Sequence, residues 1–356
     1  MKRENNLDLM RVMAAVAVAF FHSASNLTFK MASSESPAAG DLVTVMTLTF
    51  LVKVAVDLFI MVSGAFILAS PGVYDLKSHA QKTWKRLGIP TAIFTVIYLL
   101  QNYLVWLRGI KEGVERFQTT PKEMALKLLG YLLKGETASH LWYLYLLIAL
   151  YLMAPLIKKL LELTEGKHLT LAVILILWGW VSHMTGGNYL NWDLGFAAEN
   201  SGFFVLGYAL HEKYKGKKEH ALRRFLLAAL VLLIHFAGMA AFKGNTYLSA
   251  VFAPETLNGL TALEASLVFT GFMAVEPKKD WGRLSSYTYG VYLIHPLIGT
   301  LIAAVWAPVC GISFFDTASA PASALLNGAA VTVISFVLVH LWKSIRDRKT
   351  EKVQDG

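Results

Sequence analysis

Charged residues and cysteine are scarce in this chain of 356 residues. Charged side chains make up 16% of it and hydrophobic ones 55%, and the mean hydropathy is +0.50, unlike an average soluble domain. The single cysteine, Cys310, excludes an internal disulfide. No polar stretch is longer than residues 108–140, which are too few for an independent core, and no internal repeat typical of many transporters is visible. We therefore expect a membrane protein without a soluble domain.

Ten apolar runs are long enough, or nearly long enough, to cross a bilayer. They lie near residues 7–29, 42–69, 87–107, 141–157, 169–185, 200–211, 225–242, 247–275, 287–308 and 322–342. The sixth, SGFFVLGYAL, is short for a span and is the run most expected to be tilted or broken. A cleaved signal peptide is disfavoured because Arg11 interrupts the first run and nine more follow. We predict an all-α polytopic membrane protein of about ten transmembrane helices, in which residues 1–356 form one domain with a short tail from about 343.

Lysine and arginine are unevenly divided among the connections. Of the 33 in the chain, 23 fall in alternate connections that include both termini, 8 fall in the others, and Arg11 and Lys53 lie within runs. The positive-inside rule then places both termini in the cytoplasm. The net charge of +9 follows mainly from this asymmetry and favours contact with anionic membrane lipid. No nucleic-acid-binding motif accompanies it, so nucleic acid is not an expected partner.

The connection at 108–140 contains a further predicted helix. Thr119, Thr120 and Pro121 are residues typical of a helix start, and leucines then recur at helical spacing as far as Leu133. We interpret this segment as an interfacial helix on the outer face of the membrane.

The first apolar run carries ionisable residues where they are costly. In RVMAAVAVAFFH, Arg11 and His22 are eleven residues apart, so they share one helix face and lie about 16 Å apart along the axis. Such residues in membrane segments are functional candidates by default. The alternative is that Arg11 reaches the inner headgroups and pairs with Asp8, while His22 makes only a packing contact. Other ionisable candidates within runs are Lys53, Asp57, His235, Glu264, His295 and His340.

The second run combines a charged pair with a pair of small residues. Lys53 and Asp57 are four apart on one face, which indicates either a structural ion pair or a polar cavity. Ser63 and Gly64 follow, and a small pair within a spanning helix permits close backbone approach or a kink.

A basic cluster precedes the third run. Lys82, Lys85 and Arg86 lie just before Pro90. Such a cluster often follows only from the positive-inside rule, but it is also suited to binding phosphate.

Aromatic residues and histidine mark three later segments. Trp142 and Tyr143 open the fourth run as expected of an interfacial belt. In YGVYLIHPLI, Pro296 frees a backbone carbonyl that His295 or a neighbouring hydroxyl can satisfy, beside Tyr292. An outer aromatic stretch is a candidate for contact with sugar rings, although interfacial anchoring explains at least its first two members; it contains Trp178, Trp180, Tyr189 and Trp192.

The order of these motifs resembles the integral-membrane acyltransferase-3 family. The resemblance rests on Asp8-x-x-Arg11-x10-His22, VDLFIMVSG, the basic segment ending in Pro90, HLWYLYLLIALYLMAPLI and YGVYLIHPLI. It covers nearly the whole chain and is closest to short members of the glycan O-acetyltransferase type. It implies transfer of an acyl group, usually acetyl from acetyl-CoA, to a hydroxyl of a glycan or glycolipid, in a bacterial inner membrane and without a metal.

The resemblance also implies roles for particular residues. His22 and Arg11 match the family's catalytic motif, with His22 as general base and Arg11 on the CoA donor. The CoA phosphates would rest on Lys82, Lys85 and Arg86, although Thr83 stands where the family often has a first arginine. Substrate-binding or supporting roles fall to Asp8, Asp57, Ser63, Gly64, Trp142, Tyr143, Tyr292 and His295.

A transporter or flippase for a lipid-linked glycan is the alternative function. In that case the intramembrane charges would line a path rather than carry out chemistry. The oligomeric state and the acceptor are not determined by the sequence.

Overall fold

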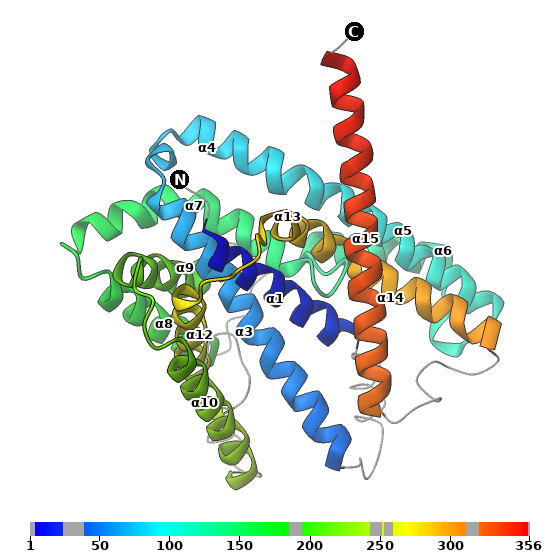
Figure 1. Cartoon of the computed structure of the whole chain (residues 1–356). Helices are drawn as coiled ribbons and strands as arrows, with labels where there is room; N and C mark the ends of the chain where they lie inside the picture. Colours follow the sequence, from blue (N-terminus) through cyan, green and yellow to red (C-terminus); the bar gives the residue numbers. More distant parts are fainter. Residues whose placement is uncertain are drawn as a thin grey trace. The chain divides into compact units, whose positions relative to one another are not determined.

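We analysed a computed structural model of the protein, shown in Figure 1. It describes residues 4–23, 39–184, 194–242, 251–252, 259–310 and 320–354, and every regular element within these ranges is helical. The predicted all-α class is therefore confirmed.

A helix corresponds to each of the ten apolar runs. They are α1 (Asn5–Ser23), α3 (Ala39–Ala69), α5 (Ile89–Lys111), α7 (Trp142–Leu163), α8 (His168–Met184), α9 (Leu194–Tyr214), α10 (Ala221–Ala241), α12 (Gly259–Ala274), α14 (Thr288–Cys310) and α15 (Ala320–Gln354). Among the described residues, six segments are long and apolar enough to cross a membrane, and α8 and α12 are shorter apolar helices. These lengths agree with a polytopic membrane protein. The sixth run is not broken, since α9 continues for 21 residues through polar positions on either side of the run.

Short helices connect the long ones. They are η1 (Pro71–Tyr74), α4 (Leu76–Thr83), the π-helical turn η2 (Trp84–Gly88), η3 (Glu115–Phe117), α6 (Pro121–Lys134) and α13 (Gly282–Ser285). The predicted start of α6 is confirmed as a capping box, in which the Thr120 hydroxyl accepts from the Glu123 N–H and the Glu123 carboxylate accepts from the Thr120 N–H. These bonds lower the pKa of the Glu123 carboxyl, the backbone bond most. The leucines at 126, 129, 132 and 133 are exposed, as an interfacial helix requires.

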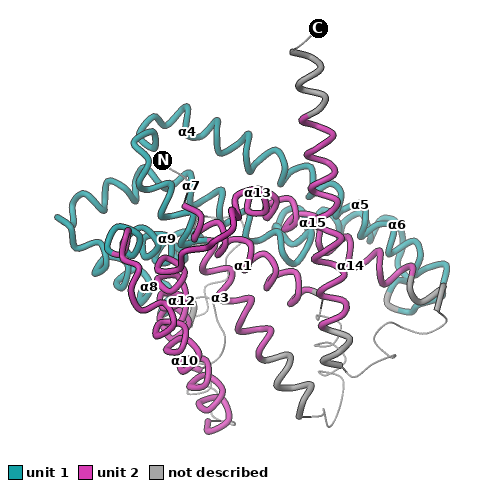
Figure 2. The backbone as a smooth tube through the Cα atoms, in the orientation of Figure 1, with its two compact units in different colours: residues 1, 60–213 teal, residues 2–59, 214–356 magenta. Residues whose placement is uncertain are grey.

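The chain divides into two compact units, coloured separately in Figure 2. Unit 1 contains residues 60–213 with residue 1, and unit 2 contains residues 2–59 and 214–356. Helix α3 passes from unit 2 into unit 1. Within unit 2, α10 packs on α12, and α1 packs on α14 and α15; within unit 1, α4 packs on α7.

Segments predicted to face the cytoplasm meet within each unit. In unit 2 the Asn5 side chain donates to the Lys279 carbonyl at 2.7 Å and accepts from the Trp281 N–H at 2.8 Å. In unit 1 the Lys158 ammonium donates to the Ser70 carbonyl at 2.8 Å. These contacts agree with the alternation of sides drawn from the charge distribution, while the cytoplasmic location of both termini stays a prediction.

In unit 1, α3 and α9 cross at two glycines. A Cβ added at Gly64 would overlap the Phe204 carbonyl oxygen, and one added at Gly207 would overlap the Met61 carbonyl oxygen. The close backbone approach predicted for the Ser63-Gly64 pair is thus confirmed. It ties the last part of α3 to α9.

Candidate active site and anion pocket

Helix α1 carries the first candidate group, in unit 2. The Arg11 guanidinium lies 3.3 Å from the Asp8 carboxylate, one helical turn away. The Asp8 side chain is 3% exposed and that of Arg11 is 29% exposed. The pairing with Asp8 therefore exists, and the Arg11 side chain stays partly exposed.

His22, at the other end of α1, lies against His295 of α14. The two ring centroids are 5.2 Å apart and the rings are inclined at 44°. His295 is buried, and the ring of Tyr292 lies 5.8 Å from it by centroids. Two residues that are distant in the sequence thus form one imidazole pair.

Pro296 determines how His295 is held. Proline lacks an N–H, so the carbonyl four residues before it, that of Tyr292, has no helical donor. The Nδ1 of His295 lies 2.8 Å from this carbonyl oxygen and 3.2 Å from that of Val291. Because a carbonyl only accepts, Nδ1 carries the hydrogen and Nε2 is the basic nitrogen of the neutral ring. The sequence allowed His295 or a neighbouring hydroxyl as the donor to the freed carbonyl, and the structure shows His295 in that role.

A second buried polar group in unit 2 contains Asp57. Asp57 is fully buried, and neither of its carboxylate oxygens has a hydrogen-bond partner among the described residues. The charges that act on it are Lys53, four residues earlier, and Glu264 of α12. Nε2 of His235 on α10 lies 3.9 Å from the Glu264 carboxylate. The sequence placed Lys53 and Asp57 on one helix face. Nothing in their spacing indicated that residues of α10 and α12 belong to the same buried polar group.

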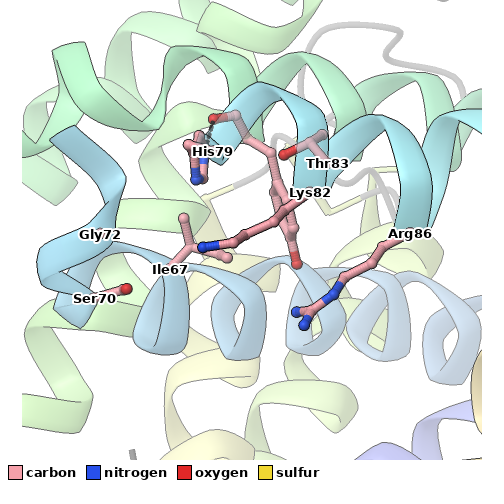
Figure 3. Close-up of a pocket in the computed structure, with 8 residues that line it drawn as sticks. Ile67, Ser70, Gly72, His79, Lys82, Thr83 and Arg86 are labelled. Carbon is pink, nitrogen blue, oxygen red and sulfur yellow. Dashed lines mark hydrogen bonds between the residues drawn. The ribbon is translucent and has the colours of Figure 1, made fainter. Parts of the chain in front are cut away.

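Unit 1 contains a basic pocket of about 250 Å³ at the junction of α3, α4 and η2. Figure 3 shows Lys82 and Arg86 extending from one helical ribbon into the same space, above the end of α3. The complete lining is Ile67, Ser70, Gly72, His79, Lys82, Thr83, Arg86 and Tyr151. Two cations that line one cavity make it a candidate anion site.

Only two of the three basic residues that precede Pro90 line the pocket. All three basic side chains are exposed, but Lys82 and Arg86, which are four apart, line the pocket, whereas Lys85 is not among the lining residues. Pro90 cannot donate to the Arg86 carbonyl, and the chain there forms the π-helical turn, in which the Ile89 N–H donates to the Trp84 carbonyl. Lys82 is therefore the cation that accompanies Arg86 in the pocket.

His79 is a pocket residue that the sequence reasoning missed. Its Nε2 donates to the Tyr151 carbonyl of α7 at 2.7 Å. Pro155 lies four residues after Tyr151 and removes the helical donor of that carbonyl, just as Pro296 does in α14. The signal available in the sequence was the helical spacing of positions 79, 82, 83 and 86, which places them on one face.

We expect His79 and Pro155 to be energetically coupled. Replacing His79 by leucine should destabilise the protein by about 1–3 kcal/mol, because a buried carbonyl loses its donor. In a Pro155→Ala background the same change should cost less, since the restored N–H at position 155 can bond to the Tyr151 carbonyl. Thermal unfolding of the two single variants and the double variant measures this coupling. Strictly additive effects would contradict it.

A neighbouring bond fastens η1 to the C-terminal end of α7. The Tyr74 hydroxyl donates to the Glu162 carboxylate, and this bond to an anion raises the pKa of Tyr74 to about 12. The exposed pair adds a second link between the same two segments as the Lys158 bond to Ser70. It helps to fix the rim of the pocket.

The remaining sequence candidates are dispersed. Ser63 is half-buried on α3, and Trp142 and Tyr143 meet edge to face with centroids 6.3 Å apart at the start of α7. Trp178 is exposed and Trp180 is half-buried on α8, while Tyr189 and Trp192 lie outside the described residues. Among the described residues no group of three or more His, Cys, Asp or Glu is placed to hold a metal ion.

The sequence profile of the acyltransferase-3 family, described as an acyltransferase domain, matches residues 4–340. The chain belongs to the acyltransferase-3 family. Comparison with curated proteins and with solved structures finds no match. The imidazole pair in unit 2 and the basic pocket in unit 1 are the candidate sites. Family membership makes this protein a multi-pass membrane acyltransferase and does not favour the transporter alternative.

Proposed function

We propose that this acyltransferase moves an acyl group, acetyl in the simplest case, from acyl-CoA to a hydroxyl of a cell-surface glycan or glycolipid at the bacterial inner membrane. The observation that carries the proposal is the pairing of His22 with His295, whose tautomer is set by the Tyr292 carbonyl. The acceptor class rests on the sequence resemblance to short members such as the enterobacterial common antigen O-acetyltransferase.

In the proposed reaction His22 acts as general base. It takes the proton of the acceptor hydroxyl while the oxygen attacks the thioester carbonyl carbon. The carbon–sulfur bond then breaks, and the thiolate leaves with the proton that His22 returns to it, so the products are the ester and free CoA. Tyr292 is a candidate donor to the developing oxyanion in unit 2. The His295 ring packs against His22 and would restrict the orientation of the His22 ring.

Donor binding is proposed to use cationic side chains, because the phosphates of CoA are negatively charged. The pocket with Lys82 and Arg86 would take CoA phosphates, and His79 would lie beside them. Arg11, partly exposed and held by Asp8, would also contact the donor. Arginine offers paired donors to phosphate, whereas Lys82 offers a single charge, so Arg86 should contribute more of the affinity.

The test compares Arg86, which lines the pocket, with its neighbour Lys85, which does not. Calorimetric binding of acetyl-CoA to the detergent-purified protein should weaken about 10- to 100-fold in Arg86→Gln, because a charge-assisted bond to phosphate is lost. Lys85→Gln removes the same charge one residue away, outside the pocket, and should bind within about 2-fold of wild type. Acetyl-pantetheine, which lacks the nucleotide phosphates, should not distinguish the two variants.

Two outcomes would contradict the proposed donor. One is the absence of saturable acetyl-CoA binding to folded wild-type protein. The other is an equal loss of affinity in Arg86→Gln and Lys85→Gln, which would indicate attraction to the basic surface rather than a site in the pocket.

A further inference from the structure

Unit 2 carries a second cation group, formed between the start of α14 and the end of α15. Arg283 of α13 donates through Nε to the Tyr287 hydroxyl at 2.9 Å, and that hydroxyl lies 2.9 Å from Nδ1 of His340. Lys343, one turn beyond His340, donates to the Ser286 carbonyl and, at 3.2 Å, to the Ser286 hydroxyl. Its ammonium also lies 4.9 Å from the centre of the Tyr287 ring.

Hydrogen-bond directions fix the roles within this group. The Tyr287 oxygen accepts from Arg283, so its own hydrogen is available for Nδ1 of His340. Nδ1 of His340 also lies 3.5 Å from a terminal nitrogen of the Arg283 guanidinium. Arg283 and Lys343 are thus held by hydroxyls, a carbonyl and an aromatic ring, all of which are neutral.

Neither cation is neutralised within the described residues. Arg283 and Lys343 make no ion pair there, and the nearest charges acting on Lys343 are Arg346 and Asp347, which pair with each other at 3.2 Å. The other nearby acid, Asp280, accepts from the Gly282 N–H through its carboxylate. Two oriented positive charges with unused donors therefore remain to bind an anion.

The residues beside Arg283 and Lys343 indicate what kind of anion these cations would bind. Trp342 is exposed beside Lys343, between the exposed apolar side chains of Leu341 and Ile345. An exposed tryptophan flanked by apolar and basic residues is typical of the membrane–water interface. The same end of unit 2 contains the Asn5 contacts that bring the segments predicted as cytoplasmic together.

We propose that Arg283 and Lys343 form a binding site for the phosphate headgroup of an anionic phospholipid in the cytoplasmic leaflet. The acyl chains would lie along the exposed apolar face of α15. The site is independent of the acyl-transfer proposal, since it uses none of its residues. It differs from general attraction of basic loops to the membrane because it depends on the orientation that Tyr287 gives to Arg283.

The experiment counts lipids bound to the full purified chain by native mass spectrometry. Phosphatidylglycerol should bind on the order of 10-fold more tightly than phosphatidylcholine, and Arg283→Gln with Lys343→Gln should remove that preference. Arg346→Gln is the matched control on the same surface, because its charge is already paired with Asp347; it should keep the preference within about 2-fold. Tyr287→Phe leaves the net charge unchanged and should still weaken phosphatidylglycerol binding several-fold.

Three results would overturn this site. An equal loss in Arg346→Gln and in the double variant would show diffuse attraction. An unaltered preference in Tyr287→Phe that keeps the wild-type unfolding temperature would show that orientation has no role. Displacement of phosphatidylglycerol by equimolar glycerol phosphate would show that a soluble phosphate is the ligand, because the acyl chains would then contribute nothing.

Discussion

His22→Ala should abolish turnover while acetyl-CoA binds as tightly as to the wild type. Loss of a general base reduces the rate by about 10²- to 10⁴-fold, because His22 no longer takes the hydroxyl proton as the bond to carbon forms. The proposed contacts to the donor phosphates do not include His22, so the dissociation constant should stay within about 2-fold. Free CoA released over hours, measured beside calorimetric binding, gives both quantities on one preparation.

Two further variants give this prediction its controls. Arg11→Ala should weaken donor binding, since it removes a partly exposed guanidinium rather than the base. His295→Asn keeps an amide donor for the Tyr292 carbonyl but removes Nε2, so it should lower the rate less than His22→Ala and alter its pH profile. The reversed pattern, in which His22 controls binding and Arg11 is dispensable, would contradict the assigned roles even though the family is established.

Local rules accounted for much of what the sequence could predict. A proline removes one identifiable hydrogen bond, so the carbonyl freed by Pro296 could be named in advance, and the adjacent His295 was its nearest donor. The capping box at Thr120 likewise involves residues three apart. The ten apolar runs follow from hydropathy alone, and each contains a helix.

Contacts between distant helices could not be read in the same way. Pro155 removes the helical donor of the Tyr151 carbonyl, as Pro296 does for the Tyr292 carbonyl. The donor that replaces it is His79, which belongs to another helix. The meeting of His22 with His295 depends on how α1 packs on α14, and the sequence sets no register between them.

The helical spacing of the basic residues before Pro90 distinguishes Lys82 from Lys85 as the partner of Arg86. Lys82 and Arg86 are one helical turn apart, whereas adjacent residues differ by about 100° around the axis. The π-helical turn at 84–88 alters the direction of the following helix, and that feature arises from Pro90 together with packing. The spacing of Lys53 and Asp57 indicated either an ion pair or a polar cavity, but the approach of Glu264 to Asp57 requires the tertiary fold.

Gly64→Ala should cause the largest loss of stability. Its new methyl group would overlap the Phe204 carbonyl oxygen, and a backbone atom within a helix cannot move aside as a flexible side chain can. We expect destabilisation of about 3 kcal/mol, with Gly207→Ala similar because it would meet the Met61 carbonyl from the other helix. Thermal unfolding in detergent, followed by tryptophan fluorescence, measures both variants.

Gly130→Ala is the matched control. It lies in α6 with no atom near the added methyl group, so better helix propensity should leave the unfolding temperature unchanged or slightly higher. The comparison also decides what Gly64 does within the family motif. Activity lost together with stability assigns it to the crossing of α3 and α9, whereas activity lost at unchanged stability would contradict that packing role and place its backbone at the reacting groups.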